Sequence, residues 1–179
     1  MDVLDYLLRH RDAVGNRPVQ PAPGFYGIFA DVPDCLPDID LPSTGLIYVG
    51  RSTDLGQRDH FNARHSGFHT FRRSIGAILK TALNLTAIPR APGPSPTNYR
   101  CFRFTEDGEE RLTRWMRSNL QLATCPFDGD TRQLEKRLIR EAAPPLNLTN
   151  WPNPQRQNIM ALRARCRDEA KLHAVPTGR

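Results

Sequence analysis

Two short apolar runs, each carrying a tyrosine, constrain the fold of this chain more than any other feature. The first run, residues 23–29, reads PGFYGIF, and the second, residues 45–50, reads GLIYVG. Runs of this length bounded by Gly and Pro are typical of short buried strands. The second run breaks at Gly50, and a helix that carries Arg58 is predicted to open around Asp54. The sequence therefore predicts two neighbouring strands that lead into a helix.

A further helix is predicted downstream, over residues 131–140, which read TRQLEKRLIR. Asp130 precedes it at the position of an N-cap, where a carboxylate can accept hydrogen bonds from the first free amides. The helix carries Glu135 in the context Glu-x-x-Leu-Ile and leads into the segment APPLN at 143–147. The predicted helix therefore carries the Glu135 carboxylate within a recognisable sequence motif.

Taken in this order, these elements resemble the GIY-YIG nuclease superfamily. Gly24-Phe25-Tyr26 stands at the first family triplet, and Tyr48-Val49-Gly50 stands at the second. Arg58 follows the second triplet at the spacing of the family's catalytic arginine. The helix with Glu135 is similar to the family's metal-binding helix, and Asn147 closes a Pro-x-x-Asn end. Four elements in the family order make a chance match improbable.

The resemblance implies an α/β (α+β) fold, with a small central, mainly antiparallel three-stranded sheet flanked by helices. A chain of 179 residues is expected to form a single domain. The family core is expected at about 23–150, with added helices within 1–16 and 155–173. The alternating segment 99–104 is predicted to be the third strand, and 121–125 is predicted to be one more short strand. Apolar periodicity predicts further helices over residues 2–14, 70–83, 109–120 and 155–172.

The resemblance also assigns catalytic roles. Glu135 would hold a divalent cation, Mg²⁺ with Mn²⁺ as a substitute, because Mg²⁺ takes few protein oxygens and keeps several waters. Arg58 cannot deprotonate, so it would serve as a fixed cation against the scissile phosphate. Tyr26 and Tyr48 would contact the attacking water or the phosphate, one of them as general base or proton relay. The structural alternatives are an exposed helix carboxylate, a surface arginine and two core tyrosines.

One position departs from the family pattern. Many members carry His or Tyr four residues after the catalytic arginine, and this chain has Asn62 there. An amide can hydrogen-bond but cannot transfer a proton at neutral pH, so this position is not expected to supply a general base. Three histidines are candidates for the extra polar catalytic group, in the order His69, His60 and His65. The ordinary alternative for each is a surface histidine.

Further residues are predicted to contact the substrate. Arg51 directly follows the second triplet, and Arg72 and Arg73 lie at the start of a predicted helix, so each is placed to contact phosphate. Asn147 is expected to fix the helix of Glu135 through hydrogen bonds from its side chain to the backbone. The substrate-binding candidates are Arg51, His60, Asn62, Arg72, Arg73 and Asn147.

Composition agrees with a nucleic-acid partner. The formal net charge is +6, and arginine greatly outnumbers lysine. Arginine's planar fork suits bidentate contacts to phosphate, although a GC-rich coding bias would give the same excess. The chain has no apolar run of membrane-spanning length and no secretion leader, so a cytoplasmic protein with no membrane partner is expected. The four cysteines lack paired spacing, which indicates neither a disulfide framework nor a zinc site.

The expected function is therefore a divalent-metal-dependent endonuclease that hydrolyses phosphodiester bonds in DNA, most naturally double-stranded. The stand-alone organisation resembles bacterial restriction and phage-defence members of the family. Two alternatives stay open: a catalytically weak or inactive nucleic-acid-binding module, and a structure-specific genome-maintenance nuclease. One active site cuts one strand, so double-strand cleavage would require a homodimer or sequential nicking.

Overall fold

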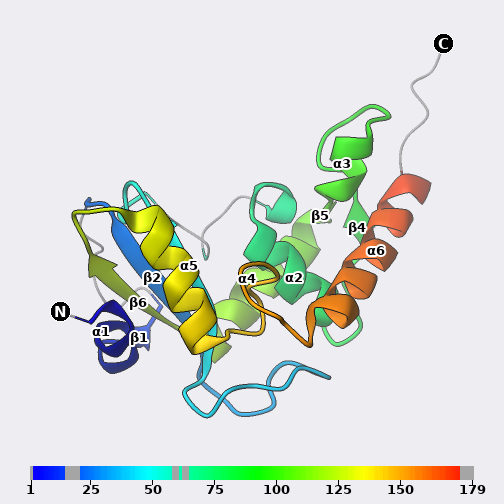
Figure 1. Cartoon of the computed structure of the whole chain (residues 1–179). Helices are drawn as coiled ribbons and strands as arrows, with labels where there is room; N and C mark the ends of the chain where they lie inside the picture. Colours follow the sequence, from blue (N-terminus) through cyan, green and yellow to red (C-terminus); the bar gives the residue numbers. More distant parts are fainter. Residues whose placement is uncertain (1, 15–20, 58–60, 62–64, 174–179) are drawn as a thin grey trace. The chain divides into compact units, whose positions relative to one another are not determined.

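The structure is a computed structural model of the chain, and it describes residues 2–14, 21–57, 61 and 65–173 (Figure 1). The chain forms two compact units. The first unit comprises Met1–Phe61 and Met116–Arg156, and the second comprises Asn62–Trp115 and Gln157–Arg179. Each unit is described by itself.

The first unit contains a four-stranded sheet with the helices α1 and α5. Its strands pair antiparallel in the order β1-β6-β2-β3, which places β3 at an edge of the described sheet. In chain order, the elements are α1 (Val3–Arg9), β1 (Asp12–Ala13), β2 (Gly24–Ala30), β3 (Leu46–Ser52), β6 (Leu120–Pro126) and α5 (Thr131–Ala142).

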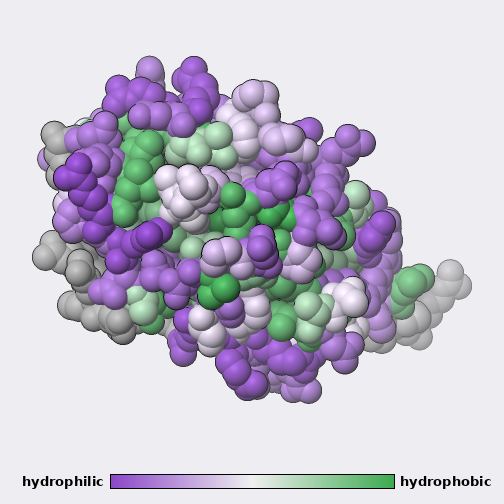
Figure 2. Space-filling view, turned by 90° about the horizontal axis from the view of Figure 1, so that it is seen from below, coloured by the Kyte–Doolittle hydropathy of each residue, from purple (hydrophilic) through white to green (hydrophobic). Residues whose placement is uncertain are grey.

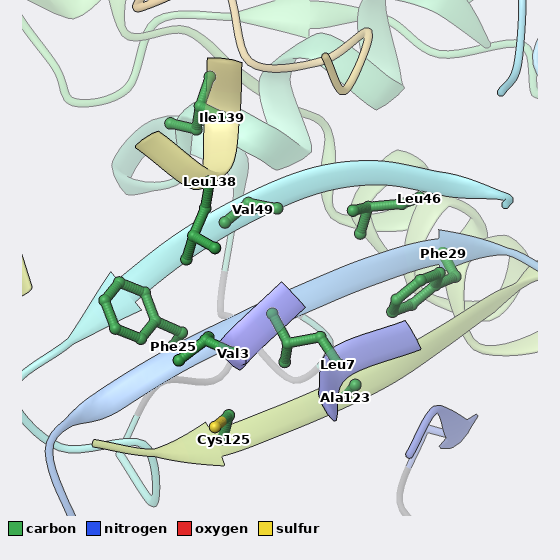
Figure 3. Packing of buried hydrophobic residues seen from close by; sticks show 10 residues of the cluster. All are labelled: Val3, Leu7, Phe25, Phe29, Leu46, Val49, Ala123, Cys125, Leu138 and Ile139. Atoms are coloured by element: carbon green, nitrogen blue, oxygen red, sulfur yellow. The ribbon is translucent and has the colours of Figure 1, made fainter. Parts of the chain in front are cut away.

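Strand alternation divides the side chains of β2 and β3 between the two faces of the sheet. Phe25, Phe29 and Val49 belong to the hydrophobic cluster that α1 and α5 complete. Tyr26 and Tyr48 each neighbour one of these residues in sequence, so they point to the opposite face. Figure 3 shows side chains from both helices and from three strands converging on this cluster.

The local sequence explains why α1 and α5 form and how they pack. Val3 and Leu7 stand one helical turn apart on α1, and both are buried. On α5, Leu138 and Ile139 are buried against the sheet. The Asp130 side chain caps α5 by accepting hydrogen bonds from the first free backbone amides.

The second unit has a small two-stranded sheet among helices. Gly76 lies so close to Phe104 that a Cβ atom would stand 2.2 Å from the Phe104 ring, so glycine permits this packing. Helix α4 contributes residues to both units. The elements are the 3₁₀ helix η1 (Ser66–Phe68), α2 (Thr70–Ile78), β4 (Ala87–Ile88), α3 (Pro96–Arg100), β5 (Arg103–Phe104), α4 (Glu106–Asn119) and α6 (Arg156–Leu172).

The α+β fold class with an antiparallel sheet is confirmed, but the predicted third strand is wrong. Residues Pro96–Arg100 form a helix, with Pro96 in its first turn, so only Arg103–Phe104 remain extended. This short strand pairs with β4 in the separate sheet of the second unit. The third strand of the central sheet is β6, which pairs with β2 along its whole length.

Two predicted helices are shorter than expected. Helix α1 ends at Arg9, and the residues Asp12–Ala13 join the central sheet as β1. Helix α2 ends at Ile78, and the chain continues in turns. In the part of the chain that the structure describes, no helix has both the length and the apolar character needed to cross a membrane.

Candidate functional site

Tyr26 and Tyr48 lie next to each other on the two adjacent strands β2 and β3. Their ring centroids are 6.1 Å apart, with the rings roughly stacked. The register pairs Tyr26 with Gly50 and Tyr48 with Ile28, so the tyrosines are diagonal neighbours on one face. Tyr26 is buried, whereas Tyr48 is partly exposed. The structure therefore brings the two predicted phenols together.

Gly50 has a specific packing role in this pair. A Cβ atom at Gly50 would lie 2.4 Å from both Cζ and Oη of Tyr26, far inside contact distance. The ring of Tyr26 thus occupies the space that a side chain at position 50 would need. The glycine of the second triplet is required here because its cross-strand partner is a tyrosine.

Arg51 and Glu135 form an ion pair between β3 and α5. Arg51 Nε donates to Glu135 Oε2 at 3.0 Å, and the two side chains are 35% and 24% exposed. Arg51 stands two residues after Val49 and therefore on the face that packs against α5. The tyrosines point to the other face, so the candidate groups lie on both sides of the edge strand β3.

Asn147 links the segment after α5 to the outer edge of β3. Its Oδ1 accepts a hydrogen bond from Val49 N at 2.8 Å, and its Nδ2 donates to Val49 O at 2.8 Å. Leu146 N also donates to Ile47 O at 3.0 Å. These bonds satisfy backbone groups that an edge strand would leave unpaired. Asn147 therefore positions the strand of Tyr48 and Arg51 relative to the helix of Glu135.

Arg72 and Arg73 have buried partners that do not fit the predicted contacts to phosphate. Arg72 is completely buried, and its Nη2 donates to Glu109 Oε2 at 2.9 Å. Arg73 is 6% exposed, and its Nη1 donates to the carbonyl oxygens of Ser66 and Gly67. A guanidinium held inside the protein has no surface to offer a phosphate, so both arginines organise the second unit instead.

Glu109 is an organising residue that the sequence analysis missed. Each of its carboxylate oxygens accepts two hydrogen bonds: Oε1 from the Ser66 and Phe104 amides, and Oε2 from Ser66 Oγ and Arg72. Glu109 is 5% exposed. Other acidic residues stand beside it in the same helix, so no local signal in the sequence distinguishes it.

His65 and His69 are the N-cap residues of two helices in the second unit. His65 caps η1, with Nδ1 accepting a hydrogen bond from Gly67 N at 3.2 Å. Burial and the neighbouring Arg103 lower the pKa of His65. His69 is the N-cap residue of α2 and makes no capping bond with its side chain.

The predicted site residues divide between the two units. Those in the first unit are Tyr26, Tyr48, Arg51, Glu135 and Asn147, and those in the second are His69, Arg72 and Arg73. Arg58, His60 and Asn62 lie outside the described residues.

Glu135 is a single carboxylate at the predicted position of a divalent-metal ligand, and its Oε2 accepts a hydrogen bond from Arg51. Among the described residues, no three His, Cys, Asp or Glu side chains gather closely enough to hold a metal ion. Mg²⁺ is often held by one or two carboxylates, with waters and substrate phosphates completing its coordination. Glu135 supplies a partly exposed carboxylate next to the tyrosine strands. One protein ligand at the surface is sufficient for this mode of binding.

Comparison with known proteins gives one match. The family model described as GIY-YIG catalytic domain matches residues 38–169, which is most of the chain. The match includes Tyr48, Glu135 and Asn147, begins after the strand of Tyr26, and extends into α6. Neither the curated proteins nor the solved structures gave a match.

Proposed function

The chain belongs to the GIY-YIG catalytic domain family, a nuclease-type family, and on that premise we propose that it is a divalent-metal-dependent endonuclease acting on double-stranded DNA. The observation that carries this proposal is the arrangement around β3. Tyr26 and Tyr48 stack on one face of the strand, and Arg51 pairs with Glu135 on the other. The two faces of this one edge strand thus carry phenols, a carboxylate and a guanidinium, which are types of group that phosphodiester hydrolysis uses.

Glu135 is the proposed ligand for Mg²⁺, with Mn²⁺ as a substitute. When bound, the cation would neutralise charge that develops on the phosphate during hydrolysis. Glu135 projects from α5, which Asp130 caps and which packs against the core. Arg51 already lies within hydrogen-bonding distance of this carboxylate, so it is placed to contact a phosphate that approaches Glu135.

The proton transfer is assigned to the tyrosines. An unperturbed phenol has a pKa of about 10, so a neighbouring cation is needed to stabilise the phenolate. Arg58 is the proposed fixed cation that contacts the scissile phosphate and stabilises the phenolate. Tyr48 is partly exposed and Tyr26 is buried, which supports Tyr48 as the phenol that meets water or phosphate. His69 remains the proposed additional polar group, because Asn62 cannot transfer a proton.

A plasmid-nicking assay tests the metal-dependent mechanism. Glu135→Gln should abolish cleavage and leave DNA affinity within a few fold, because the substitution removes the carboxylate charge but no contact to phosphate. Glu141→Gln, an exposed position on the same helix, is the matched control and should cut normally. Full activity of the unaltered protein in EDTA, or normal cleavage by Glu135→Gln, would contradict the mechanism.

Replacing each tyrosine by Phe tests the proton path. The ring and its packing are kept and only the hydroxyl is lost. Tyr48→Phe should slow single-turnover cleavage by roughly the 10²–10⁴-fold that general acid–base groups contribute. If Tyr48→Phe and Tyr26→Phe both cut normally while His69→Ala does not, the histidine is the base.

A non-catalytic nucleic-acid-binding module is the second candidate. The ion pair of Arg51 with Glu135 favours it, because the carboxylate is already neutralised by a side chain of the same protein. Binding without any Mg²⁺- or Mn²⁺-dependent cleavage would identify such a module. A role in restriction or phage defence is the narrower form of the main proposal. Phage plating on cells that produce the unaltered protein or Glu135→Gln tests this role.

A further inference from the structure

Phe68 is a large aromatic side chain that the second unit leaves exposed. It is 69% exposed, whereas the other described phenylalanines are buried, apart from Phe127, which is partly buried. The exposed large hydrophobic residues among those described are few: Val32, Phe68, Met160 and Leu172. Figure 2 shows one face of the molecule, which is mostly hydrophilic with smaller hydrophobic areas. A single exposed apolar side chain is ordinary on a protein surface, so the groups around Phe68 decide whether the ring has a function.

The backbone that presents Phe68 is held in place by buried charged groups. Ser66 donates to Glu109 from both its backbone N and its Oγ, at 2.7 and 2.9 Å. Arg73 Nη1 donates to the carbonyl oxygens of Ser66 and Gly67 at 3.1 and 2.9 Å. The helices α4 and α2 therefore fix η1 from two sides, and the ring is exposed on a preorganised support.

A guanidinium and an imidazole ring lie against the exposed Phe68 ring. The guanidinium carbon of Arg90 lies 5.1 Å from the centroid of the Phe68 ring, within cation–π distance. The His65 ring lies 5.0 Å from it on a tilted plane. Arg90 also packs against Gly67, where a Cβ atom would lie 2.6 Å from Arg90 Cγ. The positive charges of Arg103 and Arg90 contribute to the lowered pKa of His65, after burial.

We propose that Phe68 and Arg90 form a contact point for a DNA strand, with a nucleobase stacking on the Phe68 ring and a neighbouring phosphate held by Arg90. An aromatic ring beside cations is the arrangement that proteins use to bind unpaired or unstacked bases. One ring among charged side chains is too small an apolar area for a stable protein interface. This inference rests on the proposed function, since it assigns part of the substrate contact to the second unit.

The test measures binding rather than cleavage. The Glu135→Gln protein is titrated into a fluorescein-labelled DNA duplex and into the matching single strand, with anisotropy as the readout. Adding Phe68→Ala should weaken binding by roughly 5- to 150-fold, with the larger loss on the single strand, as expected for losing a base–aromatic stack. Phe68→Trp should retain affinity, and Phe68→Leu should behave like Ala. Leu172→Ala, at an exposed hydrophobic position of the same unit, should have no effect.

Several outcomes would overturn the proposal. Unchanged affinity of the Phe68→Ala variant, with a thermal melt like that of its parent, removes Phe68 from the DNA contact. Affinity retained by Phe68→Leu shows that apolar bulk rather than stacking matters. A change in sedimentation without a change in DNA affinity assigns the ring to self-association. Failure of the nuclease proposal is separable, because loss of metal-dependent cleavage by the unaltered protein leaves these binding measurements interpretable.

Discussion

Removing the Asn147 side chain should destabilise the first unit far more than removing an ordinary polar side chain. In Asn147→Ala, the N–H and C=O groups of Val49 lose the amide that pairs with both of them at 2.8 Å. Asn147 is 7% exposed and the Val49 side chain is completely buried, so water does not readily replace the amide. Both backbone groups then stay unsatisfied in a dry environment.

The magnitude follows from these two groups. An unsatisfied buried donor or acceptor costs about 1–3 kcal/mol, so the pair costs about 2–6 kcal/mol before the structure relaxes. Partial entry of water would bring the loss toward the lower end of that range. Domains are stable by only about 5–15 kcal/mol, so the variant should lose a large share of its free energy of unfolding.

Urea denaturation followed by circular dichroism measures this loss, and hydrogen exchange at the Val49 amide locates it. Gln133→Ala, which removes an exposed amide side chain from α5, is the control and should stay within about 0.5 kcal/mol of the unaltered protein. Asn147→Asp should also be destabilised, because it places a carboxylate oxygen against Val49 O. A free energy of unfolding for Asn147→Ala close to that of Gln133→Ala would refute the structural role assigned to the amide.

Three further predictions follow from other parts of the structure. Gly50→Ala should displace the Tyr26 ring, lower stability by about 1–3 kcal/mol and slow cleavage; normal cleavage would show that the position of this ring is unimportant. Burial lowers the pKa of His65, so the unfolded chain binds a proton at a higher pH than the folded protein does. The free energy of unfolding should therefore fall as the pH drops below 6.5. His65→Gln should reduce this pH dependence in thermal melts. Burial raises the pKa of Cys166 to about 12, so this thiol should resist iodoacetamide in the native protein and react on unfolding. For the same reason, the free energy of unfolding should fall as the pH rises from 9.0 toward 12. Rapid labelling of Cys166 in the native protein, seen by mass spectrometry, would contradict this.

The elements that the sequence predicted well are those with strong local signals. The two tyrosine runs form β2 and β3, and Asp130 caps α5 as its position indicated. The prediction of the third strand was wrong because the alternating apolar pattern at 99–104 overlaps a helix that starts at Pro96. The five residues Pro96–Arg100 form that helix. Alternation alone does not reveal which of two local conformations tertiary packing selects.

The parts of the candidate site that could be predicted are those set by patterns of neighbouring residues in the sequence. Tyr26 and Tyr48 could be placed side by side, because each ends up on a short strand next to the other. The partner of Arg51 could not be predicted, since Glu135 is 84 positions away and only the packing of α5 on β3 brings them together. Arg72 was predicted to contact phosphate, because nothing near it in the sequence shows that Glu109, 37 positions away, pairs with it in the interior.

The pairing of Arg72 with Glu109 restricts how this protein can change. Replacing either residue alone leaves the other charge unpaired in the interior, a defect of about 3–5 kcal/mol. Replacing both with apolar residues would still leave the Ser66 and Phe104 amides without the carboxylate to which they donate. Each residue therefore makes the other irreplaceable in a single mutational step. Sequence libraries built one substitution at a time will score both positions as intolerant, and the further donors to Glu109 restrict which double substitutions are tolerated. Epistasis of this kind is best detected by a double-mutant library at these two positions.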